Sequence, residues 1–371
     1  SVELFANSQK FSEEIVNLFA ENQIQIYPYE DIYRVVSEMT SEDKVLLDSK
    51  IMNYRLYQAI SKDTVIVDKQ NPEILMKSVK NETENLRKAH LKDAVAHTKF
   101  MYWLKKNIGR VEITELSASA RLEGLRAEQE HFLGPSFGPI SAYGEHGAIV
   151  HYSADEKSNV PLKEGKLFMT DTGGHYLEGS TDITRTVALG EVGNIEKEHF
   201  TLVARAMLRL ANTVFLYGCS GANLDCIARE VFWKEGLNFN HGTGHGVGYL
   251  LNIHEGPINF RWKEGERPAP ALEENMVITD EPGIYIEGSH GIRLENELLV
   301  RKTVKNEYGQ FMNFEILTYV PIDLDAILPE KMSTEEKEML NHYHKQVYEK
   351  VSPYLSEEER IWLKEYTRAV K

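Results

Sequence analysis

Four carboxylates stand in two turn-centred blocks in the second half of the chain. Asp171 and Asp182 belong to the block TDTGGHYLEGSTDITRT, and Glu281 and Glu295 belong to TDEPGIYIEGSHGIRLEN. When ionised, they carry a charge of about −4, which two divalent cations would balance. Two cations a few ångströms apart can hold a hydroxide at neutral pH and polarise a carbonyl group. The residue types therefore indicate a two-metal hydrolytic site.

The spacing within each block predicts a β-hairpin with its carboxylates on one face. Both blocks have β-branched and aromatic residues around a glycine turn. With the first turn centred between Tyr176 and Leu177, and the second on Gly288, each carboxylate pair lies directly across two strands. Opposed residues have Cβ atoms roughly 4.5–5.5 Å apart, and bare carboxylates that close repel each other. A cation between them is the simplest explanation, whereas a solvated structural role remains the alternative for any single acidic residue.

A histidine-rich stretch, HGTGHGVGYLLNIHEGP, lies between the two blocks and contains His241, His245 and His254. Its glycines argue against a helix and predict a loop or an irregular strand. An oxygen-rich site with one imidazole suits Mn²⁺, Fe²⁺, Co²⁺ or Zn²⁺. The stretch lacks the glycine patterns of phosphate-binding loops, which disfavours a nucleotide site. The remaining histidines of interest fall on predicted helices and receive no role: His90, His97, His199, His342 and His344.

The ordered blocks resemble the aminopeptidase P branch of the creatinase/methionine aminopeptidase superfamily. They run from about residue 80 towards the C-terminus: GPSFGPISAYGEHGAIVHY, LFMTDTGGHYLEGSTDITRT, HGTGHGVGYLLNIHEGP, TDEPGIY and GIRLENELLV. The resemblance implies an α+β fold with a "pita-bread" catalytic domain, a curved antiparallel sheet with helices outside it. A C-terminal segment beginning FEILTYVPIDLDAILPEKM resembles the extension of the long aminopeptidases P.

The resemblance also implies a set of metal ligands. In that family the residues matching Asp182 and Glu295 bridge two metal ions. The residue matching Asp171 completes the shell of one ion, and those matching His245 and Glu281 complete the shell of the other.

Further residues are implied to act on the substrate. His254 matches a histidine that hydrogen-bonds the reacting peptide, and Glu281 matches a ligand that shuttles a proton. His151 matches a substrate-binding histidine, His241 one that lines the proline pocket, and Arg293 an arginine beside the site.

The implied activity is that of a metal-dependent aminopeptidase. It would release the N-terminal residue from peptides with a free N-terminus and proline in the second position, by attack of a metal-bridging hydroxide. Mn²⁺ is the first choice of metal, with Zn²⁺, Co²⁺ and Fe²⁺ as alternatives. Three rival functions stay open: a prolidase that accepts only Xaa-Pro dipeptides, a methionine aminopeptidase, and a non-enzymatic binding protein.

Two positions depart from the family pattern. Asp280 stands where the family commonly has asparagine, and it is expected either to add negative charge near the site or to be a satisfied hydrogen-bond partner. His290 stands where an aromatic residue is frequent. Neither departure falls on a ligand position.

Composition predicts a cytoplasmic enzyme. A formal net charge of −15 disfavours nucleic acid and anionic membranes as partners. No apolar run approaches the about 20 residues needed to cross a bilayer, and no signal peptide is recognised. Cys219 and Cys226 are expected to be free buried thiols.

The chain is predicted to have three parts. Residues 1–78 form part of an N-terminal α/β domain like that of creatinase, 79–318 the pita-bread catalytic domain, and 319–371 a helical extension. Capping boxes at Ser333/Glu336 and Ser356/Glu359 predict two helices in the extension. The resemblance implies that the first of two N-terminal domains is missing here, and that the protein is a homodimer. Helices are predicted at 12–21, 29–39, 54–59, 90–106, 114–129, 194–215 and 223–235, and strands at 24–27, 44–47 and 64–67.

Overall fold

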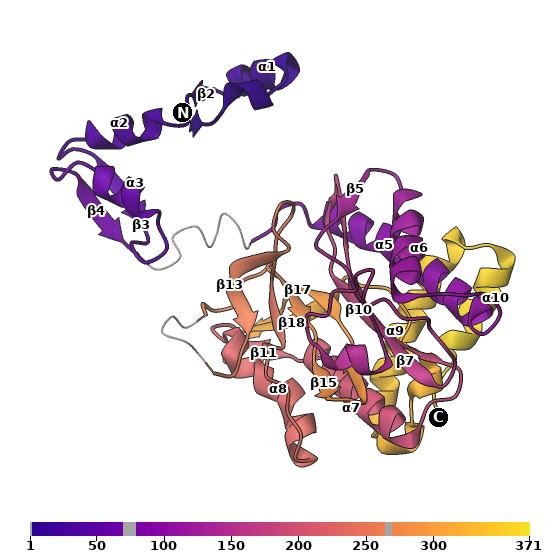
Figure 1. The fold of residues 1–371 in the computed structure, drawn as a ribbon. Coiled ribbons are helices and arrows are strands. Elements are labelled where there is room, and N and C mark those ends of the chain that lie inside the picture. The colour runs from indigo at the N-terminus through magenta and orange to yellow at the C-terminus, as the bar shows by residue number, and fades with distance from the viewer. Residues whose placement is uncertain (1, 70–78, 264–268) are drawn as a thin grey trace. The chain divides into compact units, whose positions relative to one another are not determined.

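The computed structural model describes residues 2–69, 79–263 and 269–371 (Figure 1). Two compact units can be separated along the chain, Ser1–Leu75 and Met76–Lys371. The boundary predicted at residue 78 lies outside the described residues, and each unit is described below by itself.

The smaller unit alternates strands and helices. β1 pairs with β2 and β3 with β4, both in parallel register, and parallel partners require a crossover connection, which helices provide here. Every predicted element is present to within two residues, and β1 is an additional strand. The elements are β1 Val2–Phe5, α1 Glu13–Glu21, β2 Ile24–Tyr27, α2 Asp31–Ser37, β3 Lys44–Leu47, α3 Tyr54–Ala59 and β4 Val65–Asp68.

Helices surround the larger unit. Thr114 caps α6, accepting a hydrogen bond from the Ser117 N–H. Both predicted capping boxes of the C-terminal extension are present, at the starts of α9 and α10. The helices are α5 Thr83–Asn107, α6 Glu115–Ala127, α7 Asn194–Ala211, α8 Gly221–Lys234, α9 Thr334–Val351 and α10 Glu357–Tyr366.

The predicted end of the helix at 194–215 is wrong. α7 ends at Ala211, where the Asn212 and Thr213 side chains hydrogen-bond carbonyls of the last turn. Phe215 instead begins the short strand β11 (Phe215–Leu216), opposite Met312 of β18 (Gly309–Ile316). Burial of the Phe215 ring against that sheet outweighs its local compatibility with a helix.

Antiparallel sheets form the centre of the larger unit, with helices on their outer side (Figure 1). The main sheet has the order β11-β18-β17-β14-β12-β13, and a three-stranded sheet has the order β10-β7-β6. This is the predicted α+β architecture. The strands are β5 Phe132–Pro135, β6 Ile140–Tyr143, β7 Lys166–Thr172, β8 Gly174–Tyr176, β9 Gly179–Ser180, β10 Ile183–Leu189, β12 Gly244–Val247, β13 His254–Phe260, β14 Val277–Asp280, β15 Gly283–Ile286, β16 His290–Arg293, β17 Asn296–Asn306 and β18 Gly309–Ile316.

The two predicted hairpins differ in how well their register was anticipated. In the second, Gly283 pairs with Arg293 and Asp280 with Asn296, so the turn centres on Gly288 as predicted. In the first, Thr184 rather than Asp182 lies opposite Asp171. The turn is one residue later than predicted, because Gly179, at φ 138°, takes a conformation that other residues rarely adopt. The shift moves the pairing by two residues, which keeps both aspartates on one face.

Arg185 ties the C-terminal extension to the strands beside the site. Its fully buried guanidinium donates hydrogen bonds to the carbonyl oxygens of Glu295 and Val320 and to the hydroxyl of Tyr343 on α9. Buried charges are tolerated only when their hydrogen bonds are satisfied. The folded protein must therefore keep all of these partners around the Arg185 guanidinium. The extension therefore helps to hold the strand end that carries Glu295.

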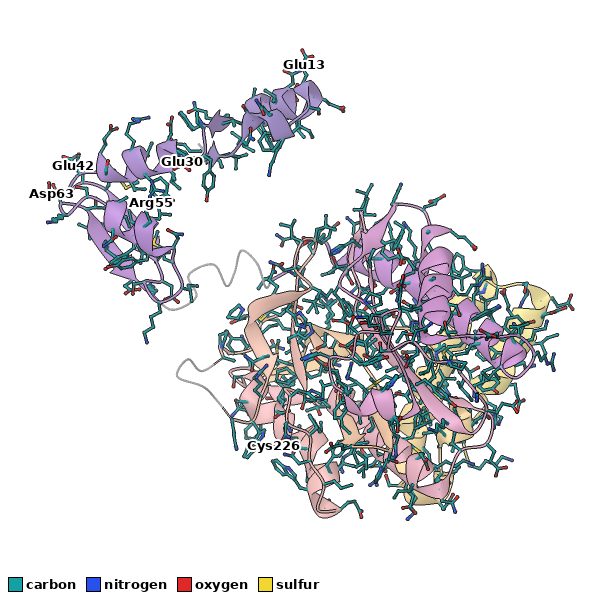
Figure 2. The ribbon with its side chains drawn as sticks, in the orientation of Figure 1. Glu13, Glu30, Glu42, Arg55, Asp63 and Cys226 are labelled. Carbon is teal, nitrogen blue, oxygen red and sulfur yellow. The ribbon has the colours of Figure 1, made fainter. Side chains whose placement is uncertain are left out.

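No helix among the described residues is long and apolar enough to cross a membrane. Both cysteines are free thiols, as predicted, but the prediction that they are buried is wrong, since Cys219 is only half-buried and Cys226 is exposed. Cys226 lies on the outer face of α8 (Figure 2).

Candidate metal centre and substrate pocket

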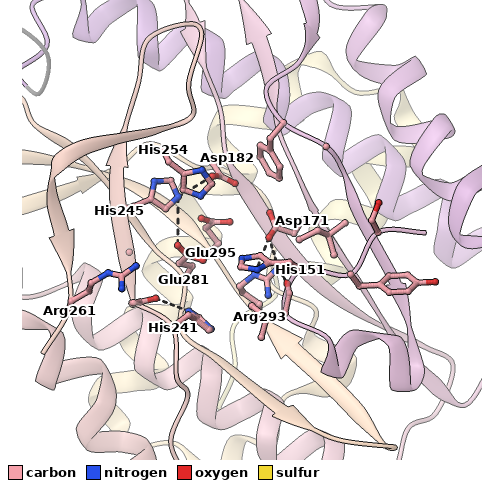
Figure 3. Close-up of a pocket in the computed structure, with 18 residues that line it drawn as sticks. His151, Asp171, Asp182, His241, His245, His254, Arg261, Glu281, Arg293 and Glu295 are labelled. Atoms are coloured by element: carbon pink, nitrogen blue, oxygen red, sulfur yellow. Dashed lines mark hydrogen bonds and ion pairs between the residues drawn. The ribbon is translucent and has the colours of Figure 1, made fainter. Parts of the chain in front are cut away.

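A cavity of about 340 Å³ opens between the two hairpin blocks and the histidine-rich stretch (Figure 3). Its wall includes all nine residues singled out from the sequence: His151, Asp171, Asp182, His241, His245, His254, Glu281, Arg293 and Glu295. The structure therefore brings together residues separated by up to about 140 positions in the chain. The roles assigned to them remain predictions.

Strand ends and the backbone position the carboxylates. Asp182 and Glu295 directly precede β10 and β17, and Glu281 follows β14. The Glu281 N–H donates to the Thr243 carbonyl at 2.8 Å, and the Glu295 N–H to the Thr184 carbonyl at 3.1 Å. Groups held by sheet hydrogen bonds are positioned more precisely than groups on free loops.

Asp182, His245 and Glu295 form the tightest cluster. One ligand atom from each lies within 4.8 Å of the others. The Nε2 atom of His245 is 3.4 Å from Asp182 Oδ2 and 3.7 Å from Glu281 Oε1. Its Nδ1 atom lies 2.9 Å from the Gly246 carbonyl and therefore carries the ring hydrogen. The lone pair of Nε2 is then free to bind a cation.

The crowding of buried carboxylates in the cluster favours the binding of a cation. Burial raises the pKa values of Asp182 and Glu295 well above the ordinary range, and the neighbouring carboxylates raise them further. Asp171 Oδ2 accepts a hydrogen bond from Arg293, while the buried Oδ1 of Asp171 has no hydrogen-bond partner among the described residues. Crowded carboxylates of this type are stabilised by bound metal. The donor set, four carboxylates and one imidazole, suits borderline divalent ions.

His254 lies at the open side of the cluster. Its ring centroid is 4.1 Å from that of His245, and its nitrogens have no hydrogen-bond partner among the described residues. Burial, together with the nearby His245, lowers the pKa of His254. A neutral imidazole with a free N–H can donate a hydrogen bond to a ligand in the cavity.

His241, Tyr285 and Arg293 form a hydrogen-bonded chain along another wall. His241 Nδ1 donates to the Gly242 carbonyl at 2.7 Å, so Nε2 accepts from the Tyr285 hydroxyl at 2.8 Å. That hydroxyl accepts from Arg293 Nη1 at 2.8 Å. Burial lowers the pKa of His241 to about 4 and raises that of Tyr285 to about 12. Both rings are therefore neutral and locked in one orientation at neutral pH.

Family models match the chain along its length. The model of metallopeptidase family M24 matches residues 84–302, that of its C-terminal region matches 310–370, and that of the creatinase/prolidase N-terminal domain matches 1–84. The chain belongs to metallopeptidase family M24. The fold is thus the pita-bread fold that the sequence resemblance implied.

Individual relatives are consistent with the M24 assignment. Xaa-Pro aminopeptidase 2 of Sus scrofa is 36% identical over 99% of this chain and 56% of its own length. Aminopeptidase P1 of Arabidopsis thaliana is 34% identical over 97% of this chain and 59% of its own. The chain spans about half the length of the curated relatives it matches. These similarities confirm the predicted kinship with aminopeptidase P.

Two solved structures show the fold relationship. X-prolyl aminopeptidase from Caenorhabditis elegans, a cytosolic enzyme with a di-nuclear active site, superimposes with a TM-score of 0.91 at 32% identity, covering 99% of this chain and 62% of that chain. Xaa-Pro dipeptidase from Bacillus anthracis superimposes with a TM-score of 0.65 at 26% identity, covering 84% of each chain.

Sequence reasoning missed Tyr285 and the residues that hold the His241 loop. Arg229 of α8 donates to the Phe239 and His241 carbonyls, both at 2.7 Å, and pairs with buried Asp225. Tyr285 stands in the recognised EPGIY block, which was a usable signal. Nothing in the local pattern of α8 distinguished its buried ion pair from a surface pair at the same spacing.

Glu297 and His90 were also missed. Glu297 Oε1 accepts the Asp182 N–H at 2.6 Å, and Oε2 lies 3.1 Å from His90 Nε2. Both side chains are fully buried. His90, to which the helical pattern assigned no role, therefore supports the group that fixes Asp182.

Asp280 behaves differently from both sequence expectations. Neither of its buried oxygens has a hydrogen-bond partner among the described residues, so it is not a satisfied partner. Burial raises its pKa well above the ordinary range, so the negative charge expected there is suppressed. The other departure, His290, hydrogen-bonds His199 at 2.9 Å, outside the cavity.

Replacing Glu297 with leucine should weaken divalent-metal binding about 10- to 100-fold, the usual effect of losing a group that orients a ligand. The Glu297→Gln variant should bind metal more tightly than the leucine variant, because its amide oxygen can still accept the Asp182 N–H. Titration calorimetry with Mn²⁺ would measure both, and thermal melting would show that each variant folds. Unchanged affinity in the leucine variant would remove Glu297 from this role.

Proposed function

We propose that this M24 protein is a metal-dependent aminopeptidase that releases the N-terminal residue from peptides with proline in the second position. The observation that carries the proposal is one cavity containing the carboxylate–histidine cluster, a free neutral His254 and the rigid His241–Tyr285–Arg293 wall. The Xaa-Pro aminopeptidase relatives support it. Because the chain spans about half of those relatives, the activity of the whole protein is part of the proposal.

The proposed ligands are Asp171, Asp182, His245, Glu281 and Glu295. When bound there, two divalent cations would supply a nucleophilic hydroxide at neutral pH and polarise the scissile carbonyl. We propose Mn²⁺ as the native ion, with Zn²⁺, Co²⁺ and Fe²⁺ as alternatives, because the mixed oxygen and nitrogen donors accept all four.

The chain's own groups handle the charge and the proton. Neutral His254 faces the cavity and donates a hydrogen bond to the oxygen on which negative charge develops. The Glu281 carboxylate takes the proton released by the nucleophile and delivers it to the leaving prolyl nitrogen. Expulsion of that nitrogen as a neutral amine requires this protonation.

The wall formed by His241, Tyr285 and Arg293 is proposed to bind the proline ring, with His151 holding the substrate from the other side. Proline lacks an N–H and has a fixed φ, so a rigid pocket can select it by shape. The hydrogen-bonded chain described above provides that rigidity without placing a free charge against the ring.

A peptide panel tests the proposal. After chelation and addition of Mn²⁺, Arg-Pro-Pro should be cleaved at least as fast as an Xaa-Pro dipeptide, because the third residue adds binding. Acetylation of the amine, or alanine in the second position, should abolish most hydrolysis. Hydrolysis of dipeptides only would favour the prolidase function, and preference for Met-Ala peptides would favour a methionine aminopeptidase. Absence of any bound or activating cation would favour a non-enzymatic binding protein.

Three further expectations stay with the proposal. The division into parts at 1–78, 79–318 and 319–371 predicts that residues 79–371 fold without the first part.

A homodimer is proposed, and light scattering of the purified chain would test it. A cytoplasmic location is supported by the Caenorhabditis elegans relative, which is described as cytosolic.

A further inference from the structure

Arg261 places a cation at the edge of the cavity. It directly follows β13, and its side chain lines both the site cavity and an adjoining hollow of about 90 Å³. In Figure 3 its guanidinium points towards the middle of the site. The resemblance to aminopeptidase P assigned it no role.

The charge of Arg261 has no partner within the part of the chain that the structure describes. The other arginine of the cavity wall, Arg293, is occupied by Asp171 and Tyr285. Arg261 makes no hydrogen bond or ion pair with another described residue, although the chain as a whole carries a net charge of −15. The four carboxylates of the site would be neutralised by two divalent cations, which leaves Arg261 available to an anionic ligand.

Arg261 lies beside the end of the cavity proposed to hold proline. The aliphatic part of the Arg261 side chain packs directly over Gly242. A Cβ added to Gly242 would lie 3.0 Å from Arg261 Cγ and 3.1 Å from Nε. Gly242 directly follows His241, which lines both hollows. A peptide bound with proline against His241 would therefore place its next residue near the Arg261 guanidinium.

Cationic side chains also surround the adjoining hollow. Arg229 lies in its wall but is already paired with Asp225. Lys263 lies above the Trp262 ring, 4.6 Å from its centroid, and lines the hollow without reaching the site cavity. Among the described residues, Arg261 is thus the one cationic side chain that lines both spaces.

We propose that Arg261 binds a carboxylate on the residue that follows proline, so that the enzyme prefers substrates with a negative charge at this point. The guanidinium fork matches the geometry of a carboxylate and can bind it through two hydrogen bonds. The carboxylate can be the C-terminus of a tripeptide or the side chain of Asp or Glu in a longer peptide. This inference rests on the proposed function, since it takes its peptide orientation from the proline pocket.

Two matched peptide pairs separate these sources. The first is Ala-Pro-Ala as the free acid and as the C-terminal amide. The second is Ala-Pro-Glu-amide and Ala-Pro-Gln-amide, which differ only in the side-chain charge. kcat/KM would be measured for the whole 371-residue chain with Mn²⁺, for Arg261→Gln, and for Lys263→Gln as the control that removes a nearby charge outside the site cavity.

The wild type should cleave the charged member of at least one pair with a kcat/KM about three- to tenfold higher than the neutral member. An effect of this size lies between that of an exposed ion pair and that of a charge-assisted hydrogen bond. The pair that shows the preference identifies the source of the carboxylate. Arg261→Gln should reduce the ratio to about one, and Lys263→Gln should retain it. The preference should also decrease as salt is raised, since the guanidinium is exposed.

Three results would overturn the inference: no preference in the wild type, a preserved ratio in Arg261→Gln, or an equal loss in Lys263→Gln, which would indicate a diffuse field. Failure of the proposed function looks different, because then no Xaa-Pro peptide is cleaved at all. In that case, calorimetric binding of the Ala-Pro-Ala acid and amide to the wild type and to Arg261→Gln still decides whether Arg261 binds the carboxylate.

Discussion

Replacing Asp182 or Glu295 with alanine should remove both metal ions and abolish peptide hydrolysis. Each is proposed to bridge the two ions, and each lies with His245 in the tightest group of ligand atoms in the described structure. Losing a bridge removes one donor from both ions and leaves the remaining carboxylates without a shared cation. Metal content of the purified variants, measured by mass spectrometry, and hydrolysis of Arg-Pro-Pro would check the result.

The control for this prediction is Glu307→Ala, which removes an exposed carboxylate from the turn between β17 and β18. It should retain metal and activity. Thermal melting would confirm that the site variants are folded, because Glu295 also accepts a hydrogen bond from the Thr184 hydroxyl. An Asp182→Ala protein with full metal content and full activity would exclude the ligand assignment.

His254→Ala should lower turnover by roughly 10²–10³-fold, the usual loss for one oxyanion donor, while both metal ions stay bound. His254 is 4.1 Å from His245 between ring centroids but is absent from the tight ligand cluster. Because the interaction is expected to form as charge develops, kcat and kcat/KM should decrease together.

His245→Ala is the matched comparison, since it removes the same side chain from the neighbouring position. It should lose metal, because the His245 Nε2 lone pair is directed at the carboxylates. Equal metal loss in the two variants would mean that His254 is itself a ligand. Equal retention in both would mean that neither histidine binds metal.

The register of the second hairpin could be predicted from sequence because its turn is symmetrical about Gly288. Pairs on both sides of Glu281 and Glu295 keep that register, Asp280 with Asn296 and Gly283 with Arg293. The first hairpin was predicted one residue out, since the local pattern does not reveal which glycine takes the positive φ. Hairpin existence thus follows from alternation and turn residues, whereas register depends on one backbone conformation.

The sequence by itself determined the residue types that could bind metal, their order along the chain, and the antiparallel frame that carries them. Those features are encoded locally, in turn residues, strand alternation and helix caps. They are also the features that carried the resemblance to aminopeptidase P.

Only the tertiary structure decided which groups meet and which stay free. Glu297 reaches both His90 and Asp182, and Arg185 reaches Tyr343, across separations of more than 100 residues. Arg261 is distinguished by the partner it lacks among the described residues, which no local pattern can show. The physical reason is that a buried polar group forms its hydrogen bonds with whichever groups the folded chain places next to it. These pairings arise from how the sheets and helices pack together.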